Sequence, residues 1–226
     1  MRLVLASNNA KKLSELSVLL ADLGDTGVAL VSQAELGIEE ADEPFDTFIE
    51  NALAKARHAA LASQGPALAD DSGLCVTALG GDPGVASAHF AGLEANGAAG
   101  GVAGGADLPP ATLAREERRR RQDQANNTLL LQRLDGQAQR TAFFISTLVA
   151  VRHATDPQPL VAVGRWPGQI LHAPRGNAGF GYDPLMFIPE LGLSVAELSL
   201  EQKNQHSHRA RAFLQMRALL REVWGL

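Results

Sequence analysis

Hydrophobic and polar positions along the first part of the chain predict alternating strands and helices. An apolar run at 3–6 is followed by a polar turn, and then by a segment, 11–23, in which leucines recur every three or four residues. The first run has the length of a strand, and the second has the period of a helix that faces a core. Another short apolar run at 28–31 predicts a second strand. This order is typical of an α/β protein.

The next segments carry clear start and stop signals. Positions 47–50 read Thr-Phe-Ile-Glu, the form of a capping box, so we expect a helix from there to about residue 63. A short strand is expected at 66–69, ending in Asp-Asp-Ser-Gly at 70–73, and 74–79 is a candidate for a further strand. The acidic pair is therefore expected at a strand end.

The second half of the chain breaks this rhythm. A helix is expected at 126–134, and β-rich runs at 141–152 and 160–165 predict a long hairpin around a turn with two prolines. A Gly-rich loop is expected at 174–184, and the apolar period over 207–224 predicts an amphipathic C-terminal helix. The expected fold class is α/β, with a mixed sheet flanked by helices.

Composition narrows the class of protein. The chain has 226 residues, of which 46% are hydrophobic and 20% charged, which suits a packed core and excludes a disordered, collagen-like or coiled-coil chain. With one cysteine, Cys75, and no apolar stretch near the roughly 18 residues of a membrane span, we expect a soluble cytoplasmic protein with no membrane partner. Cys75 is interpreted as a buried strand residue.

Charge argues against a nucleic-acid partner. The net charge of −5 provides no overall basic field, and the arginine run at 118–121 follows two glutamates that partly offset it. We interpret residues 1–226 as one domain with two lobes, and 93–123 as a Gly/Ala/Arg-rich insert expected to be flexible. A non-catalytic module that binds RNA through the arginine run stays open as the alternative, and its binding would weaken steeply with salt.

Four groups of residues carry candidate chemistry. In the first, a strand leads through Ser-Asn-Asn-Ala at 7–10 to two lysines at a helix start. Free backbone N–H groups, the positive end of a helix dipole and a lysine suit a phosphate. The alternative is an ordinary helix cap with solvated lysines.

The second group is the acidic pair Asp70 and Asp71, with the acidic loop around Asp42 and Glu43 as a possible partner. Adjacent carboxylates repel each other, and a bound divalent cation would relieve that repulsion. Hard oxygen ligands of this kind suit Mg²⁺, and a carboxylate can also act as a general base toward water. The alternative is a capped turn.

The other two groups lie in the second half. The glycines of the loop at 174–184 allow close approach of a ligand, and Phe180 and Tyr182 offer rings for stacking on a base. Lys203, with His208 and Arg209, gathers cationic donors near a helix start. The alternatives are core aromatics and a solvated basic edge. Together the four groups favour hydrolysis of a nucleotide phosphate.

Five spaced motifs also resemble one known family. They are Ser-Asn-x-x-x-Lys at 7–12, Phe-Ile-Glu-Asn-Ala-x-x-Lys-Ala at 48–56, Ala-Asp-Asp-Ser-Gly-Leu at 69–74, Gly-Phe-Gly-Tyr-Asp-Pro at 179–184 and Lys-Asn-x-x-Ser-His-Arg at 203–209. In this order they resemble the inosine triphosphate pyrophosphatase family, whose bacterial members are XTP/dITP diphosphatases. The match runs from residue 2 to about 224, interrupted by the insert.

The resemblance implies a fold and an activity. It implies a homodimer with an elongated mixed sheet, two lobes and the active site in a central cleft between them. It implies Mg²⁺-dependent hydrolysis of dITP, ITP and XTP to the monophosphate and pyrophosphate, which removes deaminated purines from the nucleotide pool. A pyrophosphatase acting on another nucleotide, such as a modified pyrimidine, stays open.

The resemblance also implies residue roles. Asp71 matches the general base and would bind the metal with Glu43, or with Asp42 if the acidic loop shifts by one. The turn at 7–12 would bind the triphosphate with Lys55 and Ser72 nearby, and 180–183 would hold the base. The substrate-binding residues implied are Ser7, Asn8, Asn9, Ala10, Lys11, Lys12, Lys55, Ser72, Phe180, Gly181, Tyr182, Asp183, Lys203, His208 and Arg209.

Overall fold

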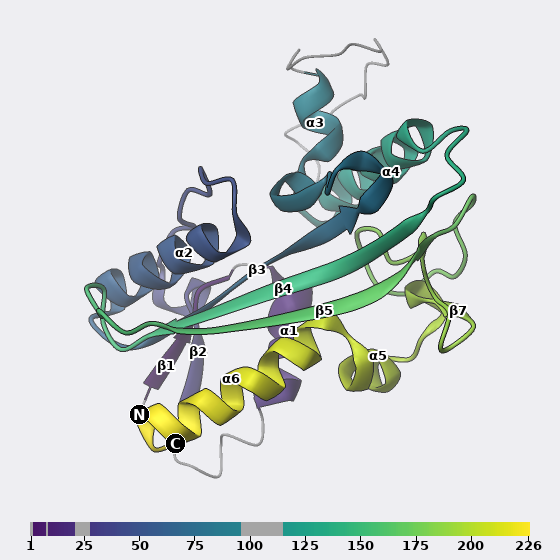
Figure 1. Cartoon of the computed structure of the whole chain (residues 1–226). Helices are drawn as coiled ribbons and strands as arrows, with labels where there is room; N and C mark the ends of the chain where they lie inside the picture. Colours follow the sequence, from purple (N-terminus) through teal and green to yellow (C-terminus); the bar gives the residue numbers. More distant parts are fainter. Residues whose placement is uncertain (1, 8, 21–27, 96–114) are drawn as a thin grey trace. The chain divides into compact units, whose positions relative to one another are not determined.

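The strands form a mixed sheet. A computed structural model describes residues 2–7, 9–20, 28–95 and 115–226, and these residues contain seven strands in the order β2-β1-β3-β4-β5-β6-β7 (Figure 1). The strands are β1 (Arg2–Leu5), β2 (Ala29–Ser32), β3 (Ala67–Val76), β4 (Thr141–Val151), β5 (Leu160–Ile170), β6 (Met186–Ile188) and β7 (Leu193–Ser194). β1 pairs in parallel with β2 and β3, whereas β6 pairs antiparallel with β5 and β7. The predicted mixed α/β sheet is confirmed.

Six α-helices lie in the described residues: α1 (Ala10–Leu20), α2 (Phe48–Ser63), α3 (Phe90–Ala95), α4 (Arg115–Arg133), α5 (Leu200–His206) and α6 (His208–Trp224). α2 begins where the capping box predicts, since the Thr47 side chain accepts a hydrogen bond from the Glu50 N–H. Ser207 caps α6 in the same way, through the N–H of Ala210. No helix in the described ranges has both the length and the apolar character that crossing a membrane requires.

The chain divides into two compact units. Unit 1 comprises Met1–Ser72, Ile145–Trp166 and Asn204–Leu226, and unit 2 comprises Gly73–Phe144 and Pro167–Lys203. The cleft implied by the resemblance stays a prediction. In unit 1, α1 and α6 pack on one face of the sheet, around residues such as Leu68 and Phe213. α2 lies on the other face (Figure 1), and there its alanines pack in one cluster with Ala69.

One strand prediction was wrong, and it concerns the acidic pair. β3 does not end before Asp70 but is ten residues long, from Ala67 through Asp70–Gly73 to Val76. Asp, Ser and Gly disfavour strands in isolation. Here each carboxylate has a cationic partner, Lys12 and Arg209 for Asp70 and Lys55 for Asp71, and this tertiary context outweighs the local preference. The acidic pair therefore lies within a strand and not in a turn.

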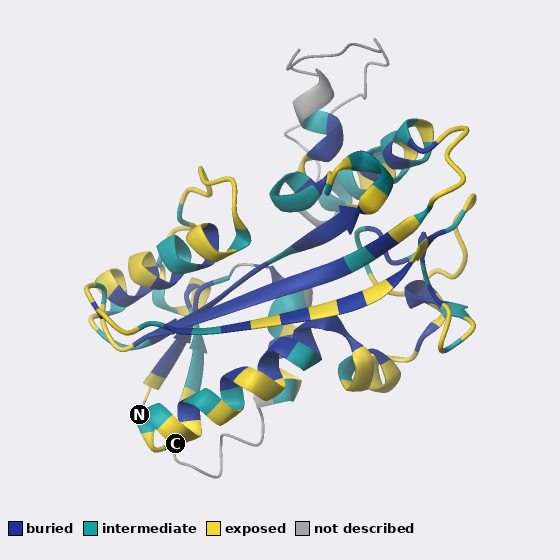
Figure 2. Cartoon of the chain, viewed as in Figure 1, coloured by how far each residue is buried: buried dark blue, intermediate teal, exposed yellow. Residues whose placement is uncertain are grey.

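β4 and β5 are neighbours in the sheet, as the hairpin prediction requires, but β5 extends to Ile170 instead of ending near 165. Figure 2 shows β4 buried almost throughout, whereas buried and exposed residues alternate along β5. A β-carbon on Gly164 would lie only 2.0 Å from the backbone oxygen of His208. This glycine therefore allows β5 to lie close against α6, which carries His208 and Arg209.

Some segments differ from the sequence prediction, and one lies outside the described residues. Residues 115–123, placed in the predicted insert, form the first half of α4, while 96–114 lie outside the described residues. Cys75 is buried in β3, as predicted. Helix α5 and strands β6 and β7 had no counterpart in the sequence prediction, because each is seven residues or shorter.

Candidate active site

The side chains of Asp70 and Asp71 point to different faces of the sheet. Successive side chains of a strand point in opposite directions, so the two carboxylates diverge although they are neighbours in sequence. The Asp70 side chain is on the same face of the sheet as Leu68, which packs against α1 and α6. The Asp71 side chain is on the same face as Ala69, which packs against α2. The like-charge repulsion expected from their adjacency is thereby reduced, and each carboxylate meets its own set of cations.

Asp70 lies at the centre of a buried ionic network. Its Oδ2 is 3.1 Å from Lys12 Nζ and 3.3 Å from Arg209 Nε, and its Oδ1 accepts a hydrogen bond of 2.6 Å from Ser146. Burial alone would raise the pKa of Asp70, but Lys12 and Arg209 hold this pKa well below its usual range. Asp70 is thus ionised throughout the physiological pH range and is already occupied by donors.

Arg209 joins Asp70 to two further residues. Its side chain is 1% exposed, donates to Ser72 Oγ over 3.0 Å and forms an ion pair with Glu15 of α1. Glu15 is buried and was missed by the sequence analysis. The signal available was a carboxylate one position before Leu16, on the buried side of an amphipathic helix. Ser146 was also missed, although it interrupts an apolar run.

Asp71 is held more loosely. Lys55 of α2 donates to Asp71 Oδ1 over 2.8 Å and to Glu43 Oε2 over 3.1 Å, so one ammonium group bridges the two carboxylates. Asp71 Oδ2 is buried and receives no hydrogen bond from the described residues. Burial raises the pKa of Asp71 to about 6, against the opposing effect of Lys55 and Lys12. This carboxylate can take up a proton near neutral pH, whereas Asp70 cannot.

The donor set fits a hard divalent cation. Four carboxylates, Glu15, Glu43, Asp70 and Asp71, face three cationic groups in unit 1, and one buried oxygen of Asp71 lacks a partner within the described residues. The described residues contain no cluster of three or more protein ligands for a metal. Mg²⁺ commonly binds through one or two carboxylates plus substrate phosphates. The structure brings Glu43, rather than Asp42, to the Lys55–Asp71 pair.

The turn between β1 and α1 is organised by its own side chains. Ser7 Oγ accepts a hydrogen bond of 3.2 Å from the Asn9 N–H, and Asn9 Oδ1 accepts one of 3.4 Å from the Lys12 N–H. Asn9 thereby caps α1, which is the helix cap that the alternative interpretation of this segment expects. Of the other predicted phosphate ligands, Asn8 lies outside the described residues, as do the side chains of Ala10 and Lys11.

In unit 2, Asp183 organises the predicted base loop. Its Oδ2 accepts hydrogen bonds from the Phe180 N–H over 2.9 Å and from Lys203 Nζ over 2.8 Å. Gly179 has a φ of +78°, and a β-carbon there would lie 2.1 Å from the same oxygen. The loop therefore needs glycine at this position. Lys203 also lies over the Phe180 ring, 4.5 Å from its centroid.

The remaining predicted residues have mainly buried positions. Tyr182 is 4% exposed, and its hydroxyl donates to the Ser87 carbonyl over 3.0 Å, so its ring is not available for stacking on a base. That part of the prediction was wrong, because a core position competes for the ring. His208 is buried in the first turn of α6. The structure thus brings Phe180, Asp183 and Lys203 together in unit 2, and Lys12, Lys55, Asp70, Asp71 and Arg209 together in unit 1.

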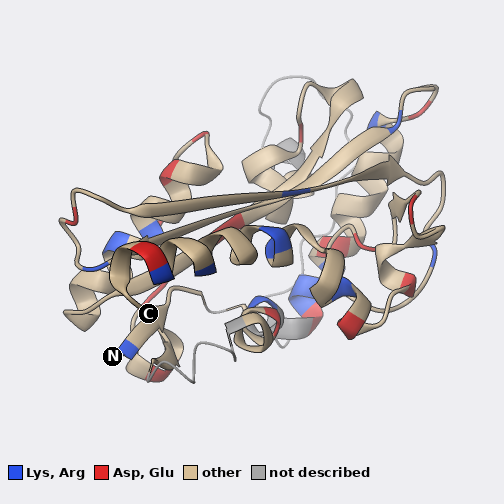
Figure 3. Cartoon of the chain, turned by 60° about the horizontal axis from the view of Figure 1, so that its bottom comes forward, with Lys and Arg blue, Asp and Glu red and all other residues tan. Residues whose placement is uncertain are grey.

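The arginine run is part of a solvated helix. Arg120 and Arg121 both form ion pairs with Glu117 on α4. Figure 3 shows basic and acidic positions mixed along the helices and loops of the described chain. These pairings count against the alternative that the run binds RNA.

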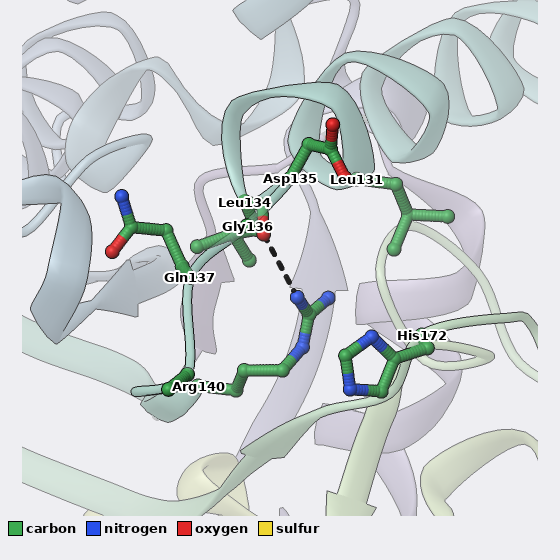
Figure 4. Close-up of a pocket in the computed structure, with 8 residues that line it drawn as sticks. Leu131, Leu134, Asp135, Gly136, Gln137, Arg140 and His172 are labelled. Carbon is green, nitrogen blue, oxygen red and sulfur yellow. Dashed lines mark hydrogen bonds between the residues drawn. The ribbon is translucent and has the colours of Figure 1, made fainter.

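A hollow of about 390 Å³ lies at the C-terminal end of α4, lined by Leu134, Arg140 and His172 among others (Figure 4). The Arg140 guanidinium donates to the carbonyls of Leu134, Ile170 and Leu171 over 2.7–3.0 Å. It therefore ties the end of α4 to the end of β5, a structural role, and we assign no ligand to this hollow.

Comparisons with known proteins agree with one another. The sequence profile of the Ham1 family matches residues 3–219. Proteins named dITP/XTP pyrophosphatase from Leptothrix cholodnii and Methylibium petroleiphilum are 61% and 60% identical, the first over the whole of both chains and the second over 99% of each. The solved structure of a HAM1 protein from Coxiella burnetii superposes with a TM-score of 0.79 at 35% identity, covering 99% of this chain and 100% of that one.

Proposed function

Because the chain belongs to the Ham1 family, we propose that it hydrolyses dITP, ITP and XTP to the nucleoside monophosphate and pyrophosphate with the help of Mg²⁺. Relatives of more than half identity over full length carry the name dITP/XTP pyrophosphatase. The observation that carries the proposal within the structure is the cluster Lys55–Asp71–Glu43, in which one carboxylate oxygen is buried and unpartnered within the described residues.

Asp71 is the proposed general base. Water attacks the α-phosphorus, the bond from that phosphorus to the oxygen bridging it to the β-phosphate breaks, and pyrophosphate leaves with this oxygen. The proton of the attacking water passes to Asp71 Oδ2. In the metal-free protein, a pKa of about 6 places Asp71 where a base is ionised at neutral pH yet still accepts a proton readily. Lys55 orients Asp71 by binding its other oxygen.

Glu43 and Asp71 are the proposed residues that would hold Mg²⁺, with substrate phosphates completing its ligands. When bound, Mg²⁺ would neutralise charge on the phosphate oxygens and lower the pKa of a bound water. Lys12 and the turn that Asn9 caps are proposed to bind the phosphates. Expected homodimer formation is part of the same proposal, and light scattering of the purified protein tests it.

The loop containing Phe180 is proposed to hold the purine. Lys203 covers one face of the Phe180 ring, so a base would stack on the other face. Hypoxanthine and xanthine present an acceptor at the 6-position, where adenine presents a donor. Cationic donors such as those of Lys203 favour the acceptor, and a polar mismatch in a desolvated site discriminates strongly. Lys203 is the proposed donor. A role for His208 and Arg209, which are buried in unit 1, rests on the family resemblance alone.

A pyrophosphate-release assay tests the function. The purified protein with Mg²⁺ is given dITP, ITP, XTP, dATP, dGTP and dTTP in turn. We expect pyrophosphate from the first three, and a loss of about 10²–10⁴-fold in kcat for Asp71→Asn. Orthophosphate as the first product, or full activity in Asp71→Asn, contradicts the proposal. A preference for dTTP would support the alternative of a pyrimidine substrate.

A matched pair of variants tests the proposed metal ligand. Glu43 lies beside Lys55, whereas Asp42 is exposed and its neighbour in sequence. We expect Glu43→Gln to raise the Mg²⁺ concentration needed for half of the maximal rate by about tenfold, and Asp42→Asn to leave it unchanged. If Asp42→Asn has the larger effect, the ligand is Asp42.

A further inference from the structure

Helix α4 holds the loop of Phe180 through both backbone groups of a single residue. The Gly181 N–H donates to Asp123 Oδ2 over 2.9 Å, and the Gly181 carbonyl accepts from Asn127 Nδ2 over 3.0 Å. Asp123 and Asn127 are four residues apart, so both lie on the same side of α4. All three residues belong to unit 2.

This double attachment fixes the loop in position and in orientation. The Gly181 N–H and C=O belong to the two peptide groups on either side of its α-carbon, so the two bonds hold both groups, whereas a single bond would leave one of them free to rotate. Gly181 lies next to Phe180 in the chain. Phe180 is therefore fixed by Asp183 within the loop and by α4 from outside it.

The helix itself is well anchored, so it can act as a rigid support. Asn126 is 2% exposed, accepts a hydrogen bond of 2.9 Å from the Ala91 N–H, and donates to the carbonyls of Ser87 and Ala88 over 3.2 Å. The Ser87 carbonyl also accepts the Tyr182 hydroxyl bond. The loop and the helix thus share an anchor at Ser87.

We propose that Asp123 and Asn127 are positioning residues for the purine ring: they fix the loop so that Phe180 meets the base in one orientation. The proposal rests on the proposed function, since it concerns the same nucleotide. Neither residue contacts the reacting phosphate in this account. Their removal should weaken binding of the base and leave the chemical step intact, which is a rise in KM without a fall in kcat.

Two substitutions of equal size give opposite expectations. Asp123→Asn keeps an oxygen that can accept from the Gly181 N–H, so we expect KM for dITP to change by less than about threefold. Asn127→Asp removes the donor and sets a carboxylate against the Gly181 carbonyl, so we expect KM to rise by about tenfold. In both variants kcat should stay within about twofold. Asp123→Ala should resemble Asn127→Asp.

Gln124→Ala is the matched control, because Gln124 is an exposed residue of the same helix and lies between the two positioning residues in sequence. Its KM and kcat should equal those of the unsubstituted protein. A general destabilisation of α4 would instead lower the melting temperature in all variants and reduce kcat. The proposal is overturned if Asn127→Asp and Gln124→Ala have the same KM.

Amide hydrogen exchange of the substrate-free protein provides a readout that does not depend on activity. We expect the peptide spanning residues 176–185 to exchange faster in Asp123→Ala and Asn127→Asp than in Gln124→Ala, with β4 unchanged. Unchanged exchange in this peptide overturns the positioning role even if the enzyme is active. If the unsubstituted protein releases no pyrophosphate from any purine nucleotide, the proposed function fails, and exchange still decides whether α4 holds the loop.

Discussion

Replacing each aspartate of the acidic pair by asparagine should have opposite effects on stability. Asp70 has a side chain that is 0% exposed and accepts bonds from Lys12, Arg209 and Ser146. Asp70→Asn keeps the size of the side chain but leaves Lys12 without this carboxylate and Arg209 with only Glu15 as a carboxylate partner. Loss of one partner from a buried ion pair costs about 3–5 kcal/mol, so we expect the free energy of unfolding to fall by that amount.

Asp71→Asn should not destabilise the fold. The Asp71 side chain is 7% exposed, and burial raises its pKa from 3.8 to about 6. The folded protein therefore binds this proton more tightly than the unfolded chain does, and ionisation of Asp71 removes stability as the pH rises through about 4 to 6. Two pKa units correspond to roughly 3 kcal/mol, an upper limit, because the amide of the variant does not reproduce the O–H group of a protonated carboxyl. At a pH near 8, we expect the free energy of unfolding of Asp71→Asn to exceed that of the unsubstituted protein by between 0 and about 3 kcal/mol.

Urea unfolding in the presence of EDTA measures both effects, followed by the fluorescence of the buried Trp166. The Asp71→Asn difference should shrink as the pH is lowered toward about 4. The Asp70 contribution, by contrast, is present above the unfolded pKa near 4 and is lost only as the pH falls further, because the folded pKa of Asp70 is lowered. Equal destabilisation by both variants, or a greater loss in Asp71→Asn, would refute the division of roles between the two carboxylates.

Three further results are expected. Ser146→Ala should lower the free energy of unfolding by about 1.5–3 kcal/mol in urea, because it removes a buried hydrogen bond to the charged Asp70; no change would mean that the bond contributes little. Gly179→Ala should raise KM for dITP, because its β-carbon would meet the Asp183 carboxylate, and an unaltered KM would show that the loop adapts. Lys55→Met should raise the pKa of Asp71 further in the metal-free protein, as read from carboxyl carbon NMR, since Lys55 lowers that pKa; a fall would contradict the assigned pairing.

Local signals in the sequence were sufficient to predict the helices that have a clear hydrophobic period and a capping residue. The Thr47 and Ser207 caps locate the starts of α2 and α6, because a hydroxyl that binds the third N–H of a helix acts within one turn. The position of the acidic pair was mispredicted. Asp70 remains in a strand because two residues distant in sequence bind it: Arg209 pairs with its charge and Ser146 donates a hydrogen bond to it. No local pattern shows such contacts.

The candidate site was predictable by residue type more than by role. The motifs contain Lys12, Lys55 and Asp71, but they do not show which residues pair. The pairs depend on the alternation of side chains between the two faces of β3, and this alternation applies only because the strand continues past Asp70. The Asp123–Gly181–Asn127 attachment had no sequence signal, because Asp and Asn on an exposed helix are usually solvated. Long-range hydrogen bonds to a loop backbone depend on the tertiary fold alone.

Hydrolysis of dITP in oxygen-18 water tests the central claim most directly. Attack of water on the α-phosphorus, with Asp71 taking its proton, places the label in dIMP and leaves pyrophosphate unlabelled. We predict labelled dIMP from the unsubstituted protein, and the same product at a rate about 10²–10⁴-fold lower from Asp71→Asn. Label in the pyrophosphate would place the attack on the β-phosphorus and contradict the account.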